Sequence, residues 1–314
     1  MKKINVLFLA PNWRVSLIRA FQNSLGFSQF GELLAGADSN PYSPALKILN
    51  PNKVIPRFVD PACLEKLLTF CREESIDAII PLTNRAIEFL NLNRKSFEDQ
   101  QTKLYINETD TISICHDKQK LSDFFRKTGI LTPDPINPEA PQFPLISKPR
   151  KGEGGKGCFV INNKQDLEYH KTKFQDSTIQ RFIEGDEYTV DWFSDAEGFP
   201  LAVIPRKRIE VRAGEVTLSQ IEMNPKIIEQ VKKAGFILGL KGPCNIQGFK
   251  EASGRFLFTD INLRFGSGSV HSINQGADIP HLIYKEIAGE KLEFNPSKVQ
   301  DGSIMSRFND GFYF

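Results

Sequence analysis

The sequence is poor in the residues that usually bind zinc or cross-link a secreted fold. Only four histidines occur among its 314 residues. None belongs to a His-Glu-x-x-His motif, so zinc-dependent hydrolysis has no support. The five cysteines are scattered without a Cys-x-x-Cys pair, which excludes a zinc ribbon and argues against a disulfide framework. Free cysteines are typical of a reducing compartment, so we expect a cytoplasmic protein.

Long apolar runs and a charge excess are also missing. No apolar run approaches the ~18 residues that would span a membrane. The 40 Lys and Arg residues nearly balance 38 Asp and Glu residues, so no electrostatic field favours nucleic acid or an anionic membrane. Residues 4–10 superficially resemble a secretory leader, but the run is short and no small-residue cleavage site follows. We expect a buried first strand and small-molecule partners.

What the chain does contain is an alternation of strand and helix patterns over residues 1–112. Residues 4–10 and 78–82 are nearly continuous apolar runs, typical of strands covered on both faces. Asp60-Pro61 supplies the start of a helix between them. This pattern predicts a parallel α/β sheet with ligands near the carboxyl ends of its strands.

The pattern of predicted secondary structure changes after residue 112. A helix is predicted over residues 117–128 and ends at Gly129, and a proline-punctuated linker follows. Shorter strands and hairpins come next, with one more helix that begins at Asn224-Pro225. The fold class is therefore α/β followed by α+β. We predict three parts: an N-terminal α/β domain (1–112), a small lid subdomain (113–184) and a C-terminal antiparallel-sheet domain (185–314).

A glycine-rich segment between two predicted strands is the densest local signal. It is not a P-loop, because Cys158-Phe159 follows where Ser or Thr is required, and it is not a dinucleotide fingerprint, because no helix follows. No kinase motif accompanies it. A flap over a polyphosphate and a plain glycine turn both remain open. The segment, which Lys148 precedes on a strand, contains Gly152, Glu153, Gly154, Gly155, Lys156 and Gly157.

A second candidate segment is a strand that runs into an acidic turn. Backbone groups at such a turn can bind an adenine edge, and a carboxylate beyond it can hold ribose hydroxyls. Acidic turns are also common without any ligand. The residues concerned are Gln180, Arg181, Phe182, Ile183 and, in the turn, Glu187.

The hairpin over residues 245–262 carries oxygen ligands at every second position. If Lys250 pairs with Arg255, Gln247 lies opposite Phe258, and Gln247, Asp260 and Asn262 share one face. Such a set suits Mg²⁺, which takes one or two carboxylates plus phosphate oxygens. Arg264 follows, where it can hold a phosphoryl oxygen in the transition state. The alternative is the solvent-facing side of an edge hairpin.

Taken in order, these features resemble the ATP-grasp superfamily, in the branch similar to the large subunit of carbamoyl phosphate synthetase. The resemblance covers nearly the whole chain, with a single synthetase unit. Asp260-Ile261-Asn262-Leu263-Arg264 is similar to the Glu-hydrophobic-Asn-Pro-Arg signature of that branch. The resemblance implies an ATP-grasp fold in which the N-terminal α/β domain precedes the lid and the C-terminal sheet.

The resemblance also implies roles for the candidate residues. Lys118 and Lys148 would contact the ATP phosphates, residues 152–157 would form the flap, residues 180–183 the adenine hinge, and Glu187 the ribose acid. Gln247, Asp260 and Asn262 would bind one or two Mg²⁺ ions, or Mn²⁺. Arg264 and Asp260 would be catalytic. The implied reaction is ATP-dependent activation of a carboxylate to an acyl phosphate, followed by attack of an amine or a thiol, with release of ADP and phosphate.

Several features depart from that branch or stay open. Asp260 replaces the commoner Glu, Leu263 replaces Pro, and Ser267-Gly268-Ser269 replaces a more glycine-rich run. Residues 83–86 (Thr-Asn-Arg-Ala) stand where members of that branch often have acidic residues, so the pocket for the acceptor substrate is not assigned. Residues 206–208 (Arg-Lys-Arg) are expected in a loop after Pro205, either facing a carboxylate or solvated. A phosphotransferase and a decayed nucleotide-binding protein remain alternative functions. A homodimer is one expectation for the assembly.

Overall fold

The computed structural model describes residues 3–137, 139–152 and 157–313. Its first part is a five-stranded parallel sheet in the order β3-β2-β1-β4-β5. The predicted apolar runs form its two central strands, β1 and β4, whose residues are all buried. The elements are β1 (Ile4–Leu9), α1 (Val15–Gln22), α2 (Leu25–Phe30), β2 (Gly31–Asp38), the 3₁₀ turn η1 (Pro44–Lys47), β3 (Asn52–Val54), α3 (Ala62–Glu73), β4 (Ala78–Pro81), α4 (Asn84–Leu92), α5 (Arg94–Glu98) and β5 (Lys103–Leu104).

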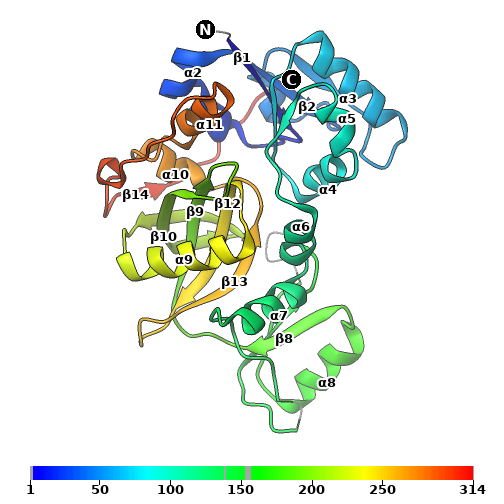
Figure 1. Ribbon diagram of the computed structural model, residues 1–314. Helices are drawn as coiled ribbons and strands as arrows, with labels where there is room; N and C mark the ends of the chain where they lie inside the picture. The colour runs from blue at the N-terminus through cyan, green and yellow to red at the C-terminus, as the bar shows by residue number, and fades with distance from the viewer. Residues whose placement is uncertain (1–2, 138, 153–156, 314) are drawn as a thin grey trace.

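A small antiparallel sheet, in the order β7-β6-β8, lies at the end of the molecule opposite the parallel sheet (Figure 1). The helix that precedes it starts and stops as predicted: Asp117 caps its first turn, and Gly129 ends it in the left-handed conformation. This part consists of α6 (Thr109–Cys115), α7 (Lys118–Thr128), β6 (Leu145–Pro149), β7 (Phe159–Ile161), α8 (Lys164–Lys173) and β8 (Ser177–Arg181).

The rest of the chain builds a six-stranded antiparallel sheet in the order β13-β12-β9-β10-β11-β14, which helix α9 crosses (Figure 1). Asn224 and Pro225 begin α9 as predicted. The elements are β9 (Asp186–Ser194), β10 (Pro200–Arg212), β11 (Glu215–Ile221), α9 (Pro225–Leu238), β12 (Gly242–Lys250), β13 (Phe256–Asn262), α10 (Ser269–Asn274), α11 (Ile279–Ile287), the 3₁₀ turn η2 (Pro296–Lys298) and β14 (Ile304–Ser306).

One predicted loop is wrong. Residues 206–208 lie inside β10, a central strand that continues through Pro205 to Arg212. Proline lacks an N–H group and usually interrupts a central strand. Here Pro205 pairs in register with Val190, and its carbonyl oxygen accepts a hydrogen bond from the Glu222 backbone, so the strand persists. Residues 206 and 208 therefore share one face of the sheet, and Lys207 faces the other way.

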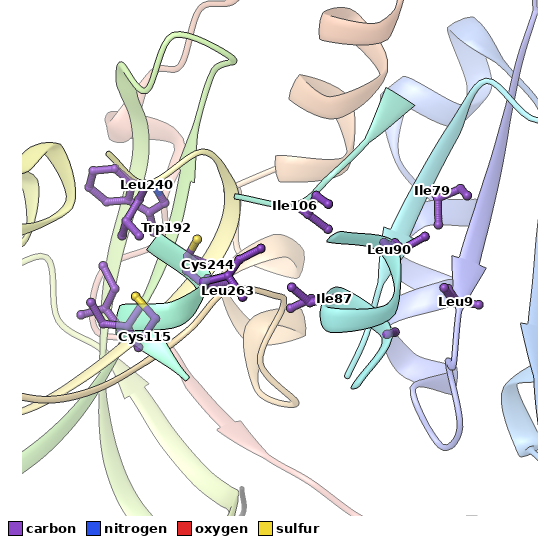
Figure 2. Packing of buried hydrophobic residues seen from close by; sticks show 14 of the residues in the cluster. Leu9, Ile79, Ile87, Leu90, Ile106, Cys115, Trp192, Leu240, Cys244 and Leu263 are labelled. Carbon is purple, nitrogen blue, oxygen red and sulfur yellow. The ribbon is translucent and has the colours of Figure 1, made fainter. Parts of the chain in front are cut away.

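A shared hydrophobic core joins the parallel sheet to the six-stranded sheet (Figure 2). It runs from Leu9 and Ile79 through Ile106 to Trp192 and Leu263. The predicted fold class is confirmed: a parallel α/β part precedes an antiparallel one. Each of the three predicted domains contains one sheet, and we keep their boundaries at residues 112 and 184 as a proposal.

The five cysteines are free thiols, and four of them are buried. Burial raises the pKa of Cys63 to about 11 and that of Cys71 to about 12, so these thiols stay protonated near neutral pH. Among the described residues, no helix is long and apolar enough to cross a membrane.

Candidate active site

A cavity of about 950 Å³ lies where the three sheets meet. Candidate residues that are far apart in the sequence line it together: Lys118, Lys148, Gly152, Arg181, Phe182, Ile183, Glu187, Gln247, Asp260, Asn262 and Arg264. Two described candidates, Gly157 and Gln180, are not among the lining residues. Glu153, Gly154, Gly155 and Lys156 lie outside the described residues.

Two lysines enter the cavity from the side of the small sheet. Lys118 begins α7, and its Nζ atom donates to the carbonyl oxygen of Gly152 at 3.1 Å. Lys148 lies on β6. Burial lowers the pKa of Lys148, while the nearby Asp260 carboxylate acts in the opposite direction. A partly desolvated lysine facing a carboxylate is a favourable place for an anionic ligand with bound cations.

Strand β8 leads into the predicted adenine hinge. The Gln180 side chain points away from the cavity and donates to Ser122 on α7 at 3.2 Å. Arg181 donates to Glu251, in the turn between β12 and β13, at 2.9 Å. Phe182 and Ile183 line the cavity at this point. The hinge is therefore fixed from both sides by polar contacts of its two first residues.

Glu187 lines the cavity and is paired with an arginine. Its Oε1 atom accepts a hydrogen bond from Arg208 at 2.9 Å. Burial lowers the pKa of Arg208, and the Glu187 charge opposes this shift. Ribose hydroxyls would thus meet an acid whose orientation an arginine already fixes.

The hairpin register differs from the prediction. Gln247 lies directly opposite Asp260, not Phe258, and Lys250 pairs with Phe256. Two offsets of one residue add up: the turn already pairs Lys250 with Phe256 instead of Arg255, and a β-bulge between Gln247 and Gly248 then places an extra residue in β13. A side chain at position 248 would not fit, because a Cβ there would lie 2.6 Å from the Leu257 carbonyl oxygen. Asp260 therefore lies directly opposite Gln247 instead of diagonal to it.

These side chains offer oxygen ligands that fit magnesium. Asp260 supplies a carboxylate, and Gln247 and Asn262 supply amide oxygens at the same cavity wall. Arg264 extends the series and donates to Asn262 Oδ1 at 3.3 Å. Across the described ranges, no group of three His, Cys, Asp or Glu side chains gathers as a metal site. A divalent ion here would therefore need amide and phosphate oxygens, as Mg²⁺ accepts.

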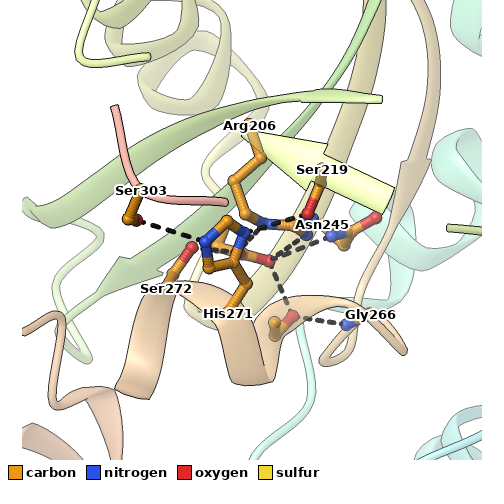
Figure 3. A network of polar contacts seen from close by, with 9 residues as sticks. Arg206, Ser219, Asn245, Gly266, His271, Ser272 and Ser303 are labelled. Atoms are coloured by element: carbon orange, nitrogen blue, oxygen red, sulfur yellow. Dashed lines mark hydrogen bonds and ion pairs between the residues drawn. The ribbon is translucent and has the colours of Figure 1, made fainter. Parts of the chain in front are cut away.

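Beneath the cavity floor lies a buried polar network that the sequence analysis missed (Figure 3). At its centre, the Asp191 carboxylate pairs with Arg206 at 2.7 Å, and both side chains are almost completely buried. Burial by itself raises the pKa of Asp191. The Arg206 charge and the hydrogen bonds that Arg206, Ser269 and Ser272 donate to the carboxylate outweigh this effect, so the pKa lies below its usual value. Beside it, burial and the Arg206 charge lower the pKa of His271 to about 4. One signal in the sequence is that Asp191 stands between the apolar residues Val190 and Trp192 of β9.

The parallel sheet contributes the remaining edge of the cavity. Its lining includes residues 10–14 after β1 and Leu82 and Thr83 after β4. Asp38 fixes the loop after β1, because its Oδ2 atom accepts a hydrogen bond from the backbone N–H of Asn12 at 2.9 Å. These lining residues follow the carboxyl ends of β1 and β4, the position at which the parallel sheet is predicted to bind ligands.

Comparison with known proteins supports this architecture. Residues 115–268 match the family model of an ATP-grasp domain, and residues 6–105 match that of a PylC-like N-terminal domain. The carbamoyl phosphate synthase large chain of Clostridium botulinum (strain Loch Maree / Type A3) is 27% identical over 260 residues. That match covers 77% of this chain but only 22% of the synthase chain.

Solved structures share the fold at low sequence identity. N5-carboxyaminoimidazole synthetase from Staphylococcus aureus, complexed with ADP, has a TM-score of 0.74 at 14% identity, covering 94% of this chain and 80% of that one. Biotin carboxylase from Campylobacter jejuni has a TM-score of 0.72 at 18% identity, covering 96% of this chain and 74% of that one.

The two matched family models together account for most of the chain, and the fold agrees with them. The chain is a member of the ATP-grasp superfamily. Within that superfamily, it belongs to the branch similar to the carbamoyl phosphate synthase large chain. The predicted roles of the individual site residues stay predictions.

Proposed function

We propose that this protein is an ADP-forming ligase that uses ATP and Mg²⁺, or Mn²⁺, to activate a small carboxylate and join it to an amine or a thiol. One observation carries the proposal. A single cavity collects two lysines and the segment predicted as the adenine hinge from the small-sheet part of the chain, and three oxygen ligands and an arginine from the C-terminal part. The names of the relatives, a carbamoyl phosphate synthase and a biotin carboxylase, are consistent with it.

The nucleotide would lie between the small sheet and the six-stranded sheet. Lys118 and Lys148 would neutralise its phosphates, since both enter from the small-sheet side. Phe182 and Ile183 would contact the adenine, and Glu187 the ribose hydroxyls. The opposing charges of Lys148 and Asp260 suit a polyphosphate with a bound cation between them.

Asp260, Gln247 and Asn262 would hold the Mg²⁺ ion. When bound, the ion would neutralise charge on the phosphate oxygens. Arg264 would stabilise the charge on the transferring phosphoryl group, because its guanidinium lies beside Asn262 on the same wall. Neighbouring residues already orient these side chains: Arg264 donates to Asn262, and Gln247 pairs with Asp260 across the hairpin.

The chemistry has two balanced steps. A carboxylate oxygen attacks the γ-phosphorus of ATP, the bond to the bridging oxygen breaks, and ADP leaves. The amine nitrogen then attacks the acyl carbon and loses a proton, while the carbon–oxygen bond to phosphate breaks and inorganic phosphate leaves. A thiol in place of the amine gives a thioester.

The decisive experiment is a screen for ADP release with ATP and Mg²⁺ against amino acids and small carboxylates, with and without an added amine. Phosphate release that depends on the amine is the expected result. A stable phosphorylated product formed without an amine would instead identify a phosphotransferase. Nucleotide binding without turnover across the panel would contradict the ligase and indicate a nucleotide-binding protein.

The nucleotide site can be tested without a substrate. Lys148→Ala removes a charge-assisted contact worth about 1.5–3 kcal/mol, so MgATP affinity should fall more than tenfold in isothermal titration calorimetry. Lys173→Ala, at the exposed end of α8, is the matched control and should bind like wild type. Unchanged affinity in a folded Lys148→Ala variant would exclude this lysine from the site.

A further inference from the structure

The loop that follows β1 carries a tryptophan at the parallel-sheet edge of the cavity. Trp13 lines the cavity and is 65% exposed, more than any other large apolar residue of the described lining. The second tryptophan of the protein, Trp192, is completely buried in β9. The indole of Trp13 is therefore open to a ligand in the cavity.

The backbone that carries this tryptophan is strained. Ala10 and Asn12 have φ angles of 54° and 44°, in the left-handed region that residues other than glycine rarely adopt. Neighbours hold Asn12 on both sides: its N–H donates to Asp38 Oδ2 at 2.9 Å, and its carbonyl oxygen accepts from the Ala45 N–H at 2.9 Å. Strained backbone persists where the surrounding structure determines it, and it gathers at sites that bind ligands. Trp13 thus follows a loop whose shape is fixed before binding.

This loop lies on the side of the proposed phosphoryl-transfer groups. Helix α1 packs against α10, and the loops that lead into these helices, residues 10–14 and 266–268, both line the cavity. Phe21 of α1 meets Phe265, with ring centroids 5.7 Å apart. Phe265 directly follows Arg264, the residue proposed to stabilise the transferring phosphoryl group. The proposed nucleotide contacts come from the small-sheet side, so a group bound at the loop belongs to a substrate that reacts with the nucleotide.

The charges around the cavity indicate which side chain fits beside the indole. Among the described lining residues, the carboxylates are Glu187, Glu215 and Asp260, and all three stand on strands of the six-stranded sheet. The charged residue in the described lining of the parallel-sheet edge is Arg14. A cationic side chain beside Trp13 would thus meet no carboxylate from that edge. An uncharged apolar side chain suits the indole, because both lose apolar surface to water when they meet.

We propose that Trp13 packs on an apolar, uncharged side chain of the substrate that reacts with the nucleotide, and so selects an aliphatic or aromatic acid or amino acid. The proposal rests on the ligase function and adds the chemical class of one substrate. Burial of apolar surface supplies the binding free energy, and the fixed loop limits the cost of ordering. Two sources of the side chain share this chemistry: the acid that is activated, and the amine that attacks it.

Binding can be observed at Trp13 itself, without turnover. Because Trp192 is buried, quenching of tryptophan fluorescence by acrylamide reports mainly on Trp13 in the folded protein. The apolar probes are phenylacetate, isovalerate, phenylalanine and leucine, each titrated into protein with MgADP. Acetate and glycine are the matched probes without a large side chain, and lysine is the matched probe with a charged one.

We expect at least one apolar probe to protect Trp13 from acrylamide in a saturable manner, and no protection by acetate, glycine or lysine. Absence of protection by all four apolar probes overturns the proposal. Equal protection by lysine also overturns it, because the indole would then bind a cation instead of an apolar group.

Three variants separate the indole from the rest of the fold. Trp13→Ala removes the apolar face, Trp13→Phe keeps an aromatic ring, and Phe236→Ala removes an exposed aromatic side chain of α9 outside the described lining. In saturation-transfer difference NMR, the affinity for the protecting probe should fall about tenfold in Trp13→Ala, recover in part in Trp13→Phe and stay unchanged in Phe236→Ala.

Unfolding curves and MgADP titration confirm that each variant folds and binds nucleotide. Equal probe affinity in wild type and a folded Trp13→Ala overturns the proposal. Neither the quenching nor the NMR result bears on whether the protein is a ligase, because ADP release is measured separately.

Once a substrate pair is found, hydroxylamine separates the two sources. It traps an acyl phosphate as a hydroxamate and carries no side chain of its own. If Trp13 contacts the activated acid, Trp13→Ala raises the KM for that acid about tenfold with hydroxylamine as nucleophile, and changes kcat less. If it contacts the nucleophile, only the KM for the amine substrate rises. A KM unchanged in both assays overturns the proposal.

Discussion

An Asp–Arg pair lies next to each of two walls of the cavity, and the two pairs differ in construction. In the six-stranded sheet, Asp191 and Arg206 are 2% and 1% exposed, and hydroxyl and amide donors surround them. At the small sheet, Asp117 is 6% exposed, but its partner Arg150 is 37% exposed. The first pair is sealed under the cavity, and the second is open to water on one side.

The hydrophobic support of the walls differs in the same way. Residues of the six-stranded sheet belong to the large core that also holds the parallel sheet, and Gly235 of α9 packs directly on Trp192. Among the described residues, the small sheet packs on a cluster of Leu145, Ile161 and Leu167, with a few partly buried neighbours. Regions with few buried contacts open at lower free energy. We infer that one wall holds substrate groups in place before binding, and that the other adjusts to the nucleotide.

The strongest test of this contrast is Asp191→Asn. It leaves the buried Arg206 charge uncompensated, which typically costs about 3–5 kcal/mol. We expect a loss of that size in urea-induced unfolding. The double variant with Arg206→Met should recover part of it, because the unpaired charge is gone. A loss no greater than that of the Asp117 variant described below would show that the two walls are equivalent.

Asp260→Asn tests the same wall for function. Asp260 is the only charged group among the three proposed metal ligands, so turnover should fall by about 10²–10³-fold, or ~2.7–4 kcal/mol in the barrier. Stability should change little, since Asp260 is only partly buried. The exposed Asp99→Asn variant is the control. Retention of most Mg²⁺-dependent activity would remove Asp260 from the site.

The pH dependence of stability probes the buried network through His271. Its pKa in the folded protein is about 4, below the ordinary 6.5, so the unfolded state takes up a proton first as the pH falls. Stability should therefore decrease between pH 6.5 and about 4, at up to about 1.4 kcal/mol per pH unit. His271→Gln removes this contribution, and its unfolding free energy should be flatter over the same range. Parallel pH profiles would contradict the shift.

The smallest expected effect is that of Asp117→Asn. Asparagine also caps helices well, and Arg150 stays in contact with water when its partner is lost. We expect Tm to fall by about 2 °C or less. A drop as large as that of Asp191→Asn would mean that the small-sheet wall is as rigidly coupled as the other.

Much of the fold was predictable because its signals are local. The apolar runs of β1 and β4, the Asp117 cap with Gly129, and Asn224-Pro225 before α9 each depend on neighbouring residues alone. The candidate residues of the hairpin and hinge were found in the same way. The hairpin register was not, because the pairing of Lys250 with Phe256 and the bulge beside Gly248 depend on how two strands meet, which neither strand shows alone.

From the sequence alone came the α/β part followed by the antiparallel part, several of their strands and helices, the ATP-grasp resemblance and a set of candidate site residues. Only the tertiary structure decided that β10 runs through Pro205, that Glu187 meets Arg208, and that Asp191 meets Arg206. Caps, turns and apolar periodicity are set by residues a few positions apart. Buried charge pairs join residues far apart in the sequence and are stable only where the fold completes their hydrogen bonds. No local sequence pattern therefore predicts them.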